Sequence, residues 1–346
     1  MTPPLRFSIC IPNYNYARYI GTTIRSVLEQ SYPHFEIIVA DNASTDDSVM
    51  VVETFGDPRI RLIKNPVNLG FAPNLDRATE TATGDYLLLL SSDDVMKPEA
   101  LAAYARLIEI YDPQKEGLVL SAGIELIDAQ GNRTGEKAGL GAELRRSLKK
   151  TGARALHDDD ELEIYRGHDL LRAAFQGSMT NIGQFLSTCY SRNLYEKAGG
   201  YRSTMAMIPD AQFSQKLMQF NPVVIFPKTS LFQYRLHGAN FYTQIFSHIQ
   251  LYCDKYQLVQ RLNGAELQVL GLTKSEVANN FIRHWCLKKS FWNAVKGNNS
   301  IAFRAWAFGW SANPACMARS LLAWAMPLVF LLSPITGFFF SKRLKT

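Results

Sequence analysis

The sequence predicts an α/β fold in which a doubly wound, mostly parallel sheet carries helices on both faces. Over the first 122 residues, short apolar runs alternate with stretches whose apolar residues recur at helical spacing. Uninterrupted apolar runs of this length are typical of buried parallel strands, and their alternation with helices is typical of doubly wound sheets. We expect strands at 7–11, 35–41, 60–64, 86–90 and 118–122.

One helix is expected in each of the four intervals between these strands, because apolar residues repeat there every three or four positions. Such spacing places them on one face, which can pack against the sheet. The four expected faces are Ile20, Ile24, Val27 and Leu28; Val49, Val52 and Phe55; Leu75, Ala78 and Ala82; and Leu101, Tyr104, Leu107 and Ile108.

The remainder of the chain is expected to be less regular. Residues 128–165 are rich in turn formers and charges, which predicts a long surface loop with a solvated acidic run at 157–163. Helical patterns return over 166–219, a last strand is expected at 223–226, and the chain after Tyr234 is mostly helical in pattern. We therefore divide it into a domain over 1–240, with halves 1–122 and 123–240, and a mainly helical C-terminal extension over 241–346.

The composition excludes several classes of protein. With 47% hydrophobic and 20% charged residues among 346, whole-chain disorder and collagen-like repeats are excluded. The five cysteines are far apart and none has CxxC spacing, so we expect a reducing compartment without a disulfide framework or thiolate zinc site. No signal peptide is expected, because the first residues lack a basic segment followed by a long apolar one.

Polar segments follow four of the expected strands, at the edge where open α/β sheets bind ligands. They are 12–15, 41–46, 65–70 and 91–94. Neither GxGxxG after the first strand nor GxxxxGK[ST] occurs, which disfavours a Rossmann dehydrogenase and a P-loop NTPase.

Asp93 and Asp94 are the most informative of these polar residues. Adjacent carboxylates repel each other, and a hard divalent cation such as Mg²⁺ or Mn²⁺ removes that repulsion while binding phosphate oxygens. The pair therefore indicates a metal–diphosphate site, with helix capping by one aspartate as the alternative. Asp41 is a candidate acceptor of hydrogen bonds from a base or ribose, or else a helix cap, and Tyr14 offers a ring for base stacking.

These segments resemble the inverting glycosyltransferases of family 2, which have the GT-A fold. The resemblance rests on FSICIPNYNYARYIGTTIRSVLEQSYPHFEIIVADNASTDDS and NPVNLGFAPNLDRATETATGDYLLLLSSDDVMKPEAL, covers about 7–110, and continues more weakly to about 240. It implies a nucleotide-binding half over 1–122 and an acceptor half over 123–240. The donor nucleotide contacts that it implies are Pro12, Tyr14, Asp41, Asn68 and Asp93. The family's LDxDD metal motif reads Leu90-Ser91-Ser92-Asp93-Asp94, so Ser91 replaces the first acid and Asp93 and Asp94 are the expected metal ligands.

The resemblance also implies roles in the second half. The family carries its catalytic base on a helix after a glycine-rich turn, and here Pro209-Asp210 stands where Glu-Asp is usual, so Asp210 is the candidate base. A positioned carboxylate can take the proton of an attacking hydroxyl; the alternative is a helix N-cap. Arg235 and His237 lie in a segment that resembles a motif near the diphosphate, where a cation can neutralise the leaving group; for His237 the alternative is a structural role.

The C-terminal region is basic and aromatic. From Val277 onward it contains nine Lys and Arg and no Asp or Glu, and residues 320–341 form an uncharged stretch of 22 residues. Cations and aromatics without acids suit a membrane interface better than nucleic acid. Pro327 and Pro334 interrupt the stretch, so we expect it to lie in the membrane plane or re-enter rather than span once. A helical subdomain packed on the core, or a dimer interface, is the alternative.

The expected function is therefore metal-dependent, inverting transfer of a sugar from a nucleotide diphosphate, with UDP favoured, to a hydroxyl of a lipid-linked glycan acceptor in cell-surface polysaccharide biosynthesis. The expected cofactor is Mg²⁺ or Mn²⁺. The expected location is the cytoplasmic face of the membrane, as a peripheral or monotopic protein with no nucleic-acid partner. Two alternatives stay open: a polyprenyl-phosphate sugar synthase, and a non-catalytic module that binds nucleotide or glycan.

Overall fold

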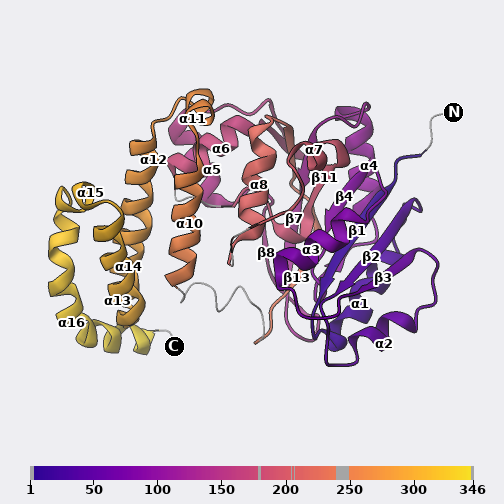
Figure 1. The fold of residues 1–346 in the computed structure, drawn as a ribbon, viewed down its shortest axis with the longest axis horizontal. Helices are drawn as coiled ribbons and strands as arrows, with labels where there is room; N and C mark the ends of the chain where they lie inside the picture. The colour runs from indigo at the N-terminus through magenta and orange to yellow at the C-terminus, as the bar shows by residue number, and fades with distance from the viewer. Residues whose placement is uncertain (1–3, 178–180, 204, 206, 239–248, 344–346) are drawn as a thin grey trace. The chain divides into compact units, whose positions relative to one another are not determined.

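The computed structural model describes residues 4–177, 181–203, 205, 207–238 and 249–343, with side chains as far as Leu332. These residues form two compact units (Figure 1). The first consists of 1–171, 181–205 and 209–238, and the second of 172–180, 206–208 and 239–346.

A nine-stranded sheet forms the centre of the first unit, in the order β3-β2-β1-β4-β11-β6-β12-β10-β9. Only β11 and β10 run against the other strands, so the expected mostly parallel α/β sheet is confirmed. The strands are β1 (Phe7–Asn13), β2 (Phe35–Asp41), β3 (Ile60–Lys64), β4 (Tyr86–Leu89), β6 (Leu118–Ser121), β9 (His157–Asp158), β10 (Leu162–Arg166), β11 (Thr188–Ser191) and β12 (Val223–Pro227).

The sheet has a continuous apolar core because its central strands are covered on both faces. Every residue of β1 and of β2 is buried. The helix α1 buries Ile20, Ile24 and Val27, the face that its spacing predicts. The helices of this unit are α1 (Ala17–Leu28), α2 (Ser48–Glu53), α3 (Phe71–Glu80), α4 (Ala100–Tyr111), α5 (Ala142–Thr151), α6 (Gly167–Gln176, which continues into the second unit), α7 (Arg192–Lys197) and α8 (Pro209–Gln219), with a 3₁₀ turn at Phe185–Ser187.

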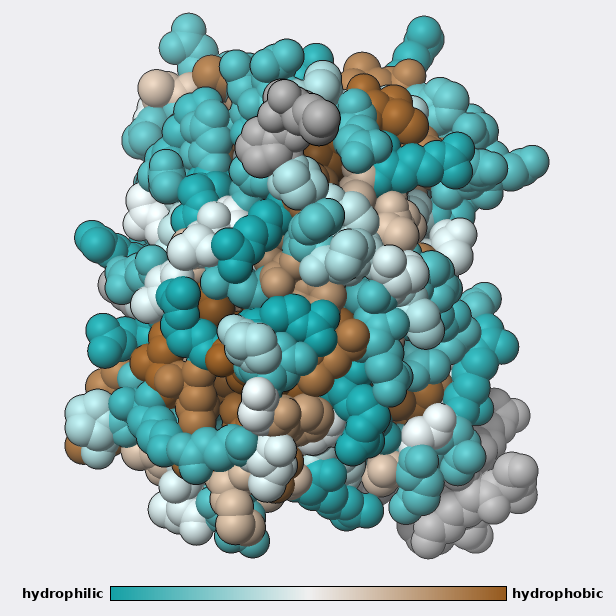
Figure 2. Space-filling model, turned by 90° about the vertical axis from the view of Figure 1, so that its right-hand side faces the viewer, coloured by the Kyte–Doolittle hydropathy of each residue, from teal (hydrophilic) through white to brown (hydrophobic). Residues whose placement is uncertain are grey.

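The outer edge of the sheet is less completely covered. The residues of β3 are partly buried or exposed. Figure 2 views the molecule from the side on which β2 and β3 lie in Figure 1, and hydrophilic side chains border a hollowed apolar area there.

A second, four-stranded sheet has the order β5-β13-β7-β8. Its strands are β5 (Val95–Met96), β7 (Gly123–Ile127), β8 (Arg133–Lys137) and β13 (Ser230–Arg235). Pairing of β13 with β5 joins Phe232 to Met96 and Gln233 to Val95. Because β5 directly follows the 91–94 segment, this register brings the end of β13 to the polar residues that follow β4.

The prediction of a long surface loop over 128–165 is wrong. This region contains β8, α5, β9 and β10, since Leu144 and Leu148 of α5 and Ile164 of β10 are buried in the core. The sequence-based prediction over 166–219 also lacked β11. This strand of four residues pairs antiparallel with both β4 and β6, so its conformation is fixed by strand neighbours rather than by local pattern.

The second unit is helical, which confirms the expected C-terminal extension. Its helices are α10 (Ile249–Arg261), α11 (Gly264–Leu270), α12 (Lys274–Phe281), a π-helix (Ile282–Lys289), α13 (Ser290–Val295), α14 (Asn299–Ala312), α15 (Pro314–Ala318) and α16 (Leu321–Arg343). The helix α16 continues through Pro327 and Pro334. The expectation that these prolines interrupt the apolar stretch is therefore wrong. Within the described part of the chain, no helix has the length and apolar character needed to cross a membrane.

Candidate active site

The carboxylate of Asp41 organises the loop after β2. Its Oδ2 accepts hydrogen bonds from Asn13 Nδ2 at 2.8 Å and Ser44 Oγ at 2.6 Å. Its Oδ1 accepts one from the Ser44 N–H at 2.9 Å. Asp41 thus lies at the carboxyl end of its strand, where its position in the sequence places it. Each carboxylate oxygen can accept two hydrogen bonds, so Oδ1 retains capacity for a ligand donor.

Tyr14 projects from the surface beside this loop and is 41% exposed. The next residue, Asn15, has a φ of 58°, which turns the chain sharply after β1. Asn15 Oδ1 accepts the N–H of Thr45 at 2.8 Å, so the turn is tied to the loop after β2. The Tyr14 ring is therefore available for stacking, whereas Pro12 is buried at the end of β1.

A network of buried asparagines ties the third polar segment to the second. Asn42 Nδ2 donates to Asn68 Oδ1 at 2.8 Å, and Asn42 Oδ1 accepts the Leu69 N–H at 2.8 Å. Asn65 Nδ2 donates to Asn74 Oδ1 at 2.8 Å, and Asn74 Nδ2 donates to the carbonyl of Ala40 at 2.8 Å. The hydrogen bond between Asn42 and Asn68 thus helps to fix the conformation of the 65–70 segment.

Asn42 and Asn74 are two site residues that were not predicted individually from the sequence. The available signal for Asn74 was an amide among apolar residues on the inner face of α3, a position that requires hydrogen-bond partners in the core.

The structure brings Asp93 and Asp94 together with Arg235 and His237. His237 Nε2 lies 2.8 Å from Asp93 Oδ2, with the two side chains 6% and 8% exposed. The backbone N–H of Arg235 donates to Asp94 Oδ1 at 3.0 Å, and Arg235 Nε donates to the carbonyl of Asp93 at 2.9 Å. Residues 141 to 144 positions apart in sequence therefore form one cluster, because β13 pairs with β5.

Aromatic and electrostatic contacts complete this cluster. The rings of Tyr19 and His237 lie 4.9 Å apart, and the Arg235 guanidinium lies 5.2 Å from the Tyr19 ring centre. Burial raises the pKa of Asp93, while the hydrogen bond from His237 lowers it in part. The pKa of Asp94 is raised well above its ordinary value by burial and then by Asp93. The two carboxylates are therefore an unfavourable pair, which the guanidinium of Arg235 and the hydrogen bond between Asp93 and His237 partly compensate.

The donor set suits a hard divalent cation. Asp94 Oδ2 is buried with no hydrogen-bond partner, and carboxylate oxygens suit hard ions such as Mg²⁺ and Mn²⁺. Asp93 and His237 are the partly accessible members of the cluster, so these two would hold the cation. Among the described residues, no group of three or more His, Cys, Asp or Glu converges on a metal position. The remaining ligands would therefore be phosphate oxygens and water, as is usual for Mg²⁺.

Asp210 belongs to a different group of residues in the first unit. It is the second residue of α8, and Asn181 Nδ2 donates to its Oδ2 at 3.3 Å. The structure places it inside the first turn rather than before it, as an N-cap would be. Asn181 was not identified from the sequence, because nothing in its neighbourhood resembles a motif.

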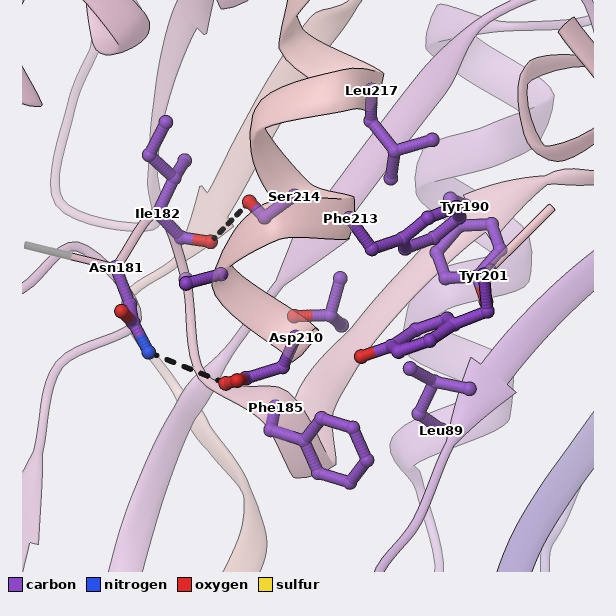
Figure 3. Close-up of a pocket in the computed structure, with 13 residues that line it drawn as sticks. Leu89, Asn181, Ile182, Phe185, Tyr190, Tyr201, Asp210, Phe213, Ser214 and Leu217 are labelled. Carbon is purple, nitrogen blue, oxygen red and sulfur yellow. Dashed lines mark hydrogen bonds between the residues drawn. The ribbon is translucent and has the colours of Figure 1, made fainter. Parts of the chain in front are cut away.

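A small cavity of about 20 Å³ lies beside Asp210, bordered mainly by apolar and aromatic side chains such as Leu89, Phe185 and Phe213 (Figure 3). This volume holds about one water molecule. The hydroxyl of Tyr201 points toward Asp210 in Figure 3 and is buried without a hydrogen-bond partner. Burial, and then the charge of Asp210, raise the pKa of Tyr201 well above its ordinary value, so this hydroxyl stays protonated.

Comparison with known proteins gives the fold class first. The crystal structure of S. aureus TarS 1–349 in complex with UDP-GlcNAc superimposes with a TM-score of 0.61 at 16% identity, covering 96% of this chain and 88% of that one. This likeness establishes the GT-A fold. Residues 8–115 match the model of the family described as Glycosyl transferase family 2. This match confirms, over residues 8–115, the resemblance to family 2 glycosyltransferases seen in the sequence.

The sequence relatives match over part of their length. An uncharacterized protein of Mycobacterium tuberculosis is 31% identical over 224 residues, 64% of each chain. The E. coli UDP-Glc:alpha-D-GlcNAc-diphosphoundecaprenol beta-1,3-glucosyltransferase WfgD is 38% identical over 88 residues, 25% of this chain and 35% of its own length. The matched part of this chain thus spans less than two thirds of the length of each of these relatives.

Proposed function

We propose that this protein is an inverting glycosyltransferase. It moves a sugar from a nucleotide diphosphate, with UDP-sugars favoured, to a hydroxyl of a lipid-linked glycan acceptor in cell-surface glycan biosynthesis. The observation that carries the proposal is the cluster of Asp93, Asp94, Arg235 and His237 after β4. It lies at the strand edge where open α/β sheets bind their ligands, and it combines buried acids with cations.

The ends of β1 and β2 bind the nucleoside in this proposal. The exposed ring of Tyr14 stacks on the base, and Asp41, held by Asn13 and Ser44, accepts hydrogen bonds from base or ribose. The asparagine network around Asn68 fixes the neighbouring loop before the donor arrives, which reduces the ordering cost of binding.

The cluster after β4 stabilises the leaving diphosphate. Negative charge develops there as the bond between the sugar and the phosphate breaks. The always-charged guanidinium of Arg235 is fixed by Asp93 and Tyr19, so it needs no reorganisation to face that charge. Asp93 and His237 would hold a Mg²⁺ or Mn²⁺ ion, which would add further neutralisation of the phosphate oxygens.

Asp210 acts as the general base. Its carboxylate takes the proton of the acceptor hydroxyl while the acceptor oxygen bonds to the anomeric carbon from the side opposite the leaving diphosphate. Such assistance contributes roughly 10²–10⁴-fold to the rate. Asn181 holds Asp210 Oδ2, and thereby orients the carboxylate.

Two names among the similar proteins support the choice of substrates. TarS was solved with UDP-GlcNAc, and WfgD is named for transfer from UDP-Glc to a diphosphoundecaprenol-linked sugar. A lipid-linked acceptor requires the enzyme to work at a membrane surface. We place it on the cytoplasmic face as a peripheral or monotopic protein, in keeping with the basic and aromatic C-terminal region.

A screen of nucleotide sugars tests this proposal. The purified full chain should bind one UDP-sugar more tightly with Mn²⁺ than in EDTA, and should transfer its sugar to a polyprenyl-diphosphate-linked acceptor with inverted anomeric configuration. A retained configuration would contradict single displacement. Transfer to polyprenyl phosphate itself would indicate the synthase instead, and nucleotide binding without transfer or hydrolysis would indicate a non-catalytic module.

A further inference from the structure

The helix α16 is apolar on two opposite faces, but the second unit covers only one of them. On the inner face, Ala323 and Met326 are fully buried and pack in a cluster with Ala294 of α13 and Ala302 of α14. The outer face consists of large hydrophobic side chains that are between 51% and 89% exposed: Leu321, Trp324, Leu328, Leu331 and Leu332. We call these five residues the outer face of α16.

This outer face differs from that of an ordinary surface helix. A helix that packs on a core with one side normally presents charged or polar residues to water with the other. Large hydrophobic residues exposed singly are common, but a contiguous group marks a surface that binds a partner or a membrane. The spacing of residues 321, 324, 328, 331 and 332 places them on one side of the helix, over about three turns.

The patch extends onto α14. The rings of Trp310 and Trp324 lie 5.2 Å apart. An apolar groove of about 440 Å³ runs between the two helices at this point, lined by Trp306, Trp310, Trp324 and Pro327 among others. Tryptophan is the side chain most typical of the boundary between water and lipid.

The charge of this region selects an anionic lipid surface as the occupant. From Val277 onward the chain carries nine Lys and Arg and no Asp or Glu. Exposed cations in it include Arg283, Lys288, Lys296, Arg304 and Arg319. A second copy of this chain would bring the same cations to the contact and be repelled. Anionic headgroups would be attracted, at about 1 kcal/mol for each cation near the surface.

We propose that the outer face of α16 lies in the plane of an anionic membrane, with its leucines and Trp324 among the acyl chains and Arg319, just before the helix, at the headgroups. This deepens the proposed function, because it gives the surface that would hold the enzyme beside a lipid-linked acceptor. Membrane binding can be measured without any sugar transfer, so the two proposals can fail separately.

The test is sedimentation of the full-length protein with vesicles of phosphatidylcholine, with or without phosphatidylglycerol. Wild-type protein should bind the anionic vesicles, and high salt should remove only part of this binding. Leu328→Asp should lower the vesicle partition coefficient by roughly tenfold or more, as expected from the loss of one buried leucine. Arg319→Gln should lower binding about fivefold at low salt only, because charge attraction is screened.

Val269→Asp is the matched control. Val269 lies on α11 of the same unit and is 60% exposed, against 63% for Leu328, so both changes place a carboxylate at a similarly exposed position. The control should bind vesicles like wild type. The proposal is overturned if wild-type protein ignores anionic vesicles, or if both Asp variants lose binding equally. It is also overturned if Leu328→Asp only dissociates a dimer and leaves vesicle binding unchanged.

Discussion

At the scale of single residues, two adjacent aspartates have different surroundings. Asp94 is fully buried and receives the backbone N–H of Arg235, which secures the end of β13. Asp93 is slightly exposed and faces His237. The sequence alone shows an acidic pair, whereas the contacts distinguish the two, and they support our proposal that Asp93 is the ligand and Asp94 the supporting residue.

Asp93→Asn should abolish sugar transfer while leaving the fold intact. The amide is close in size to the carboxylate, but it removes the negative charge that would bind the cation. Activity of the purified variant, with and without Mn²⁺, is the measurement, and circular dichroism checks the fold. Full activity of the variant, or of the wild type in excess EDTA, would exclude the metal role.

Asp210→Asn should lower kcat roughly 10²-fold or more, with donor affinity nearly unchanged. The reason is that Asp210 would act on the acceptor hydroxyl rather than on the nucleotide. Asp169→Asn is a suitable control, since Asp169 also lies in the first turn of a helix, α6. An equal loss of donor affinity would show that Asp210 is structural.

Asp76 on α3 should make stability depend on pH. Burial, and then the charge of Glu80, raise its pKa from 3.8 to about 6. Between these values the folded state holds a proton that the unfolded state has released, so the contribution of Asp76 to stability falls as pH rises from about 4 to about 6. Asp76→Asn should therefore be more stable than wild type at pH 7.5 and equal to it at pH 4. If the difference in free energy of unfolding between the two proteins is the same at pH 7.5 and at pH 4, this assignment is contradicted.

At the scale of elements, close backbone approach fixes the register of the central strands. Gly84 precedes β4 and lies against β1, and its N–H donates to Ser8 Oγ at 2.8 Å. A Cβ at this position would come within 2.7 Å of backbone atoms of Phe7 and Ser8. A glycine here is therefore a packing requirement of the parallel pair.

Gly84→Ala should destabilise the protein by about 1–3 kcal/mol, because the neighbouring atoms are backbone and cannot move aside freely. Gly117→Ala should change stability little, since no atom lies within 4 Å of a Cβ built there. Urea unfolding of the two variants compares them directly. Equal midpoints would show that the sheet accommodates the methyl group.

At the scale of the whole molecule, charge and function divide along the chain. Residues 1–110 carry 9 Lys and Arg against 14 Asp and Glu, while the last 70 residues carry nine Lys and Arg and no Asp or Glu. The acidic part contains the strand ends that we propose to bind the nucleotide. The basic part contains α16, whose outer face we propose to bind lipid.

Deletion of residues 318–346 should release much of the protein from cell membranes and leave nucleotide binding intact. The apolar contribution should exceed the ionic one, because salt screens charge but does not remove apolar burial. High-salt washing of the wild type should therefore leave most of it on membranes. If the truncated protein stays on the membrane, or if it loses nucleotide binding, the prediction that membrane binding and nucleotide binding belong to different units is wrong.

The sequence by itself determined the α/β class, the positions of the parallel strands and the resemblance of residues 8–115 to family 2 glycosyltransferases. These features are local: the apolar runs of β1 and β2, the face of α1 and the Asp93-Asp94 motif are read from neighbouring residues. The regions that the sequence analysis misjudged lack such local signals. The four residues of β11 become a strand only between β4 and β6, and α5 was hidden in a stretch rich in charges and turn formers.

Only the tertiary structure decided which distant residues meet. The pairing of β13 with β5 brings Arg235 and His237 to Asp93 and Asp94, and the fold sets Asn181 against Asp210. It also decided that α16 continues through its prolines with one face buried and the other exposed. Hydrophobic periodicity records whether a residue is apolar, but not which neighbour covers it. Contacts between segments that lie far apart in the chain depend on strand order and packing, which no short window of sequence contains.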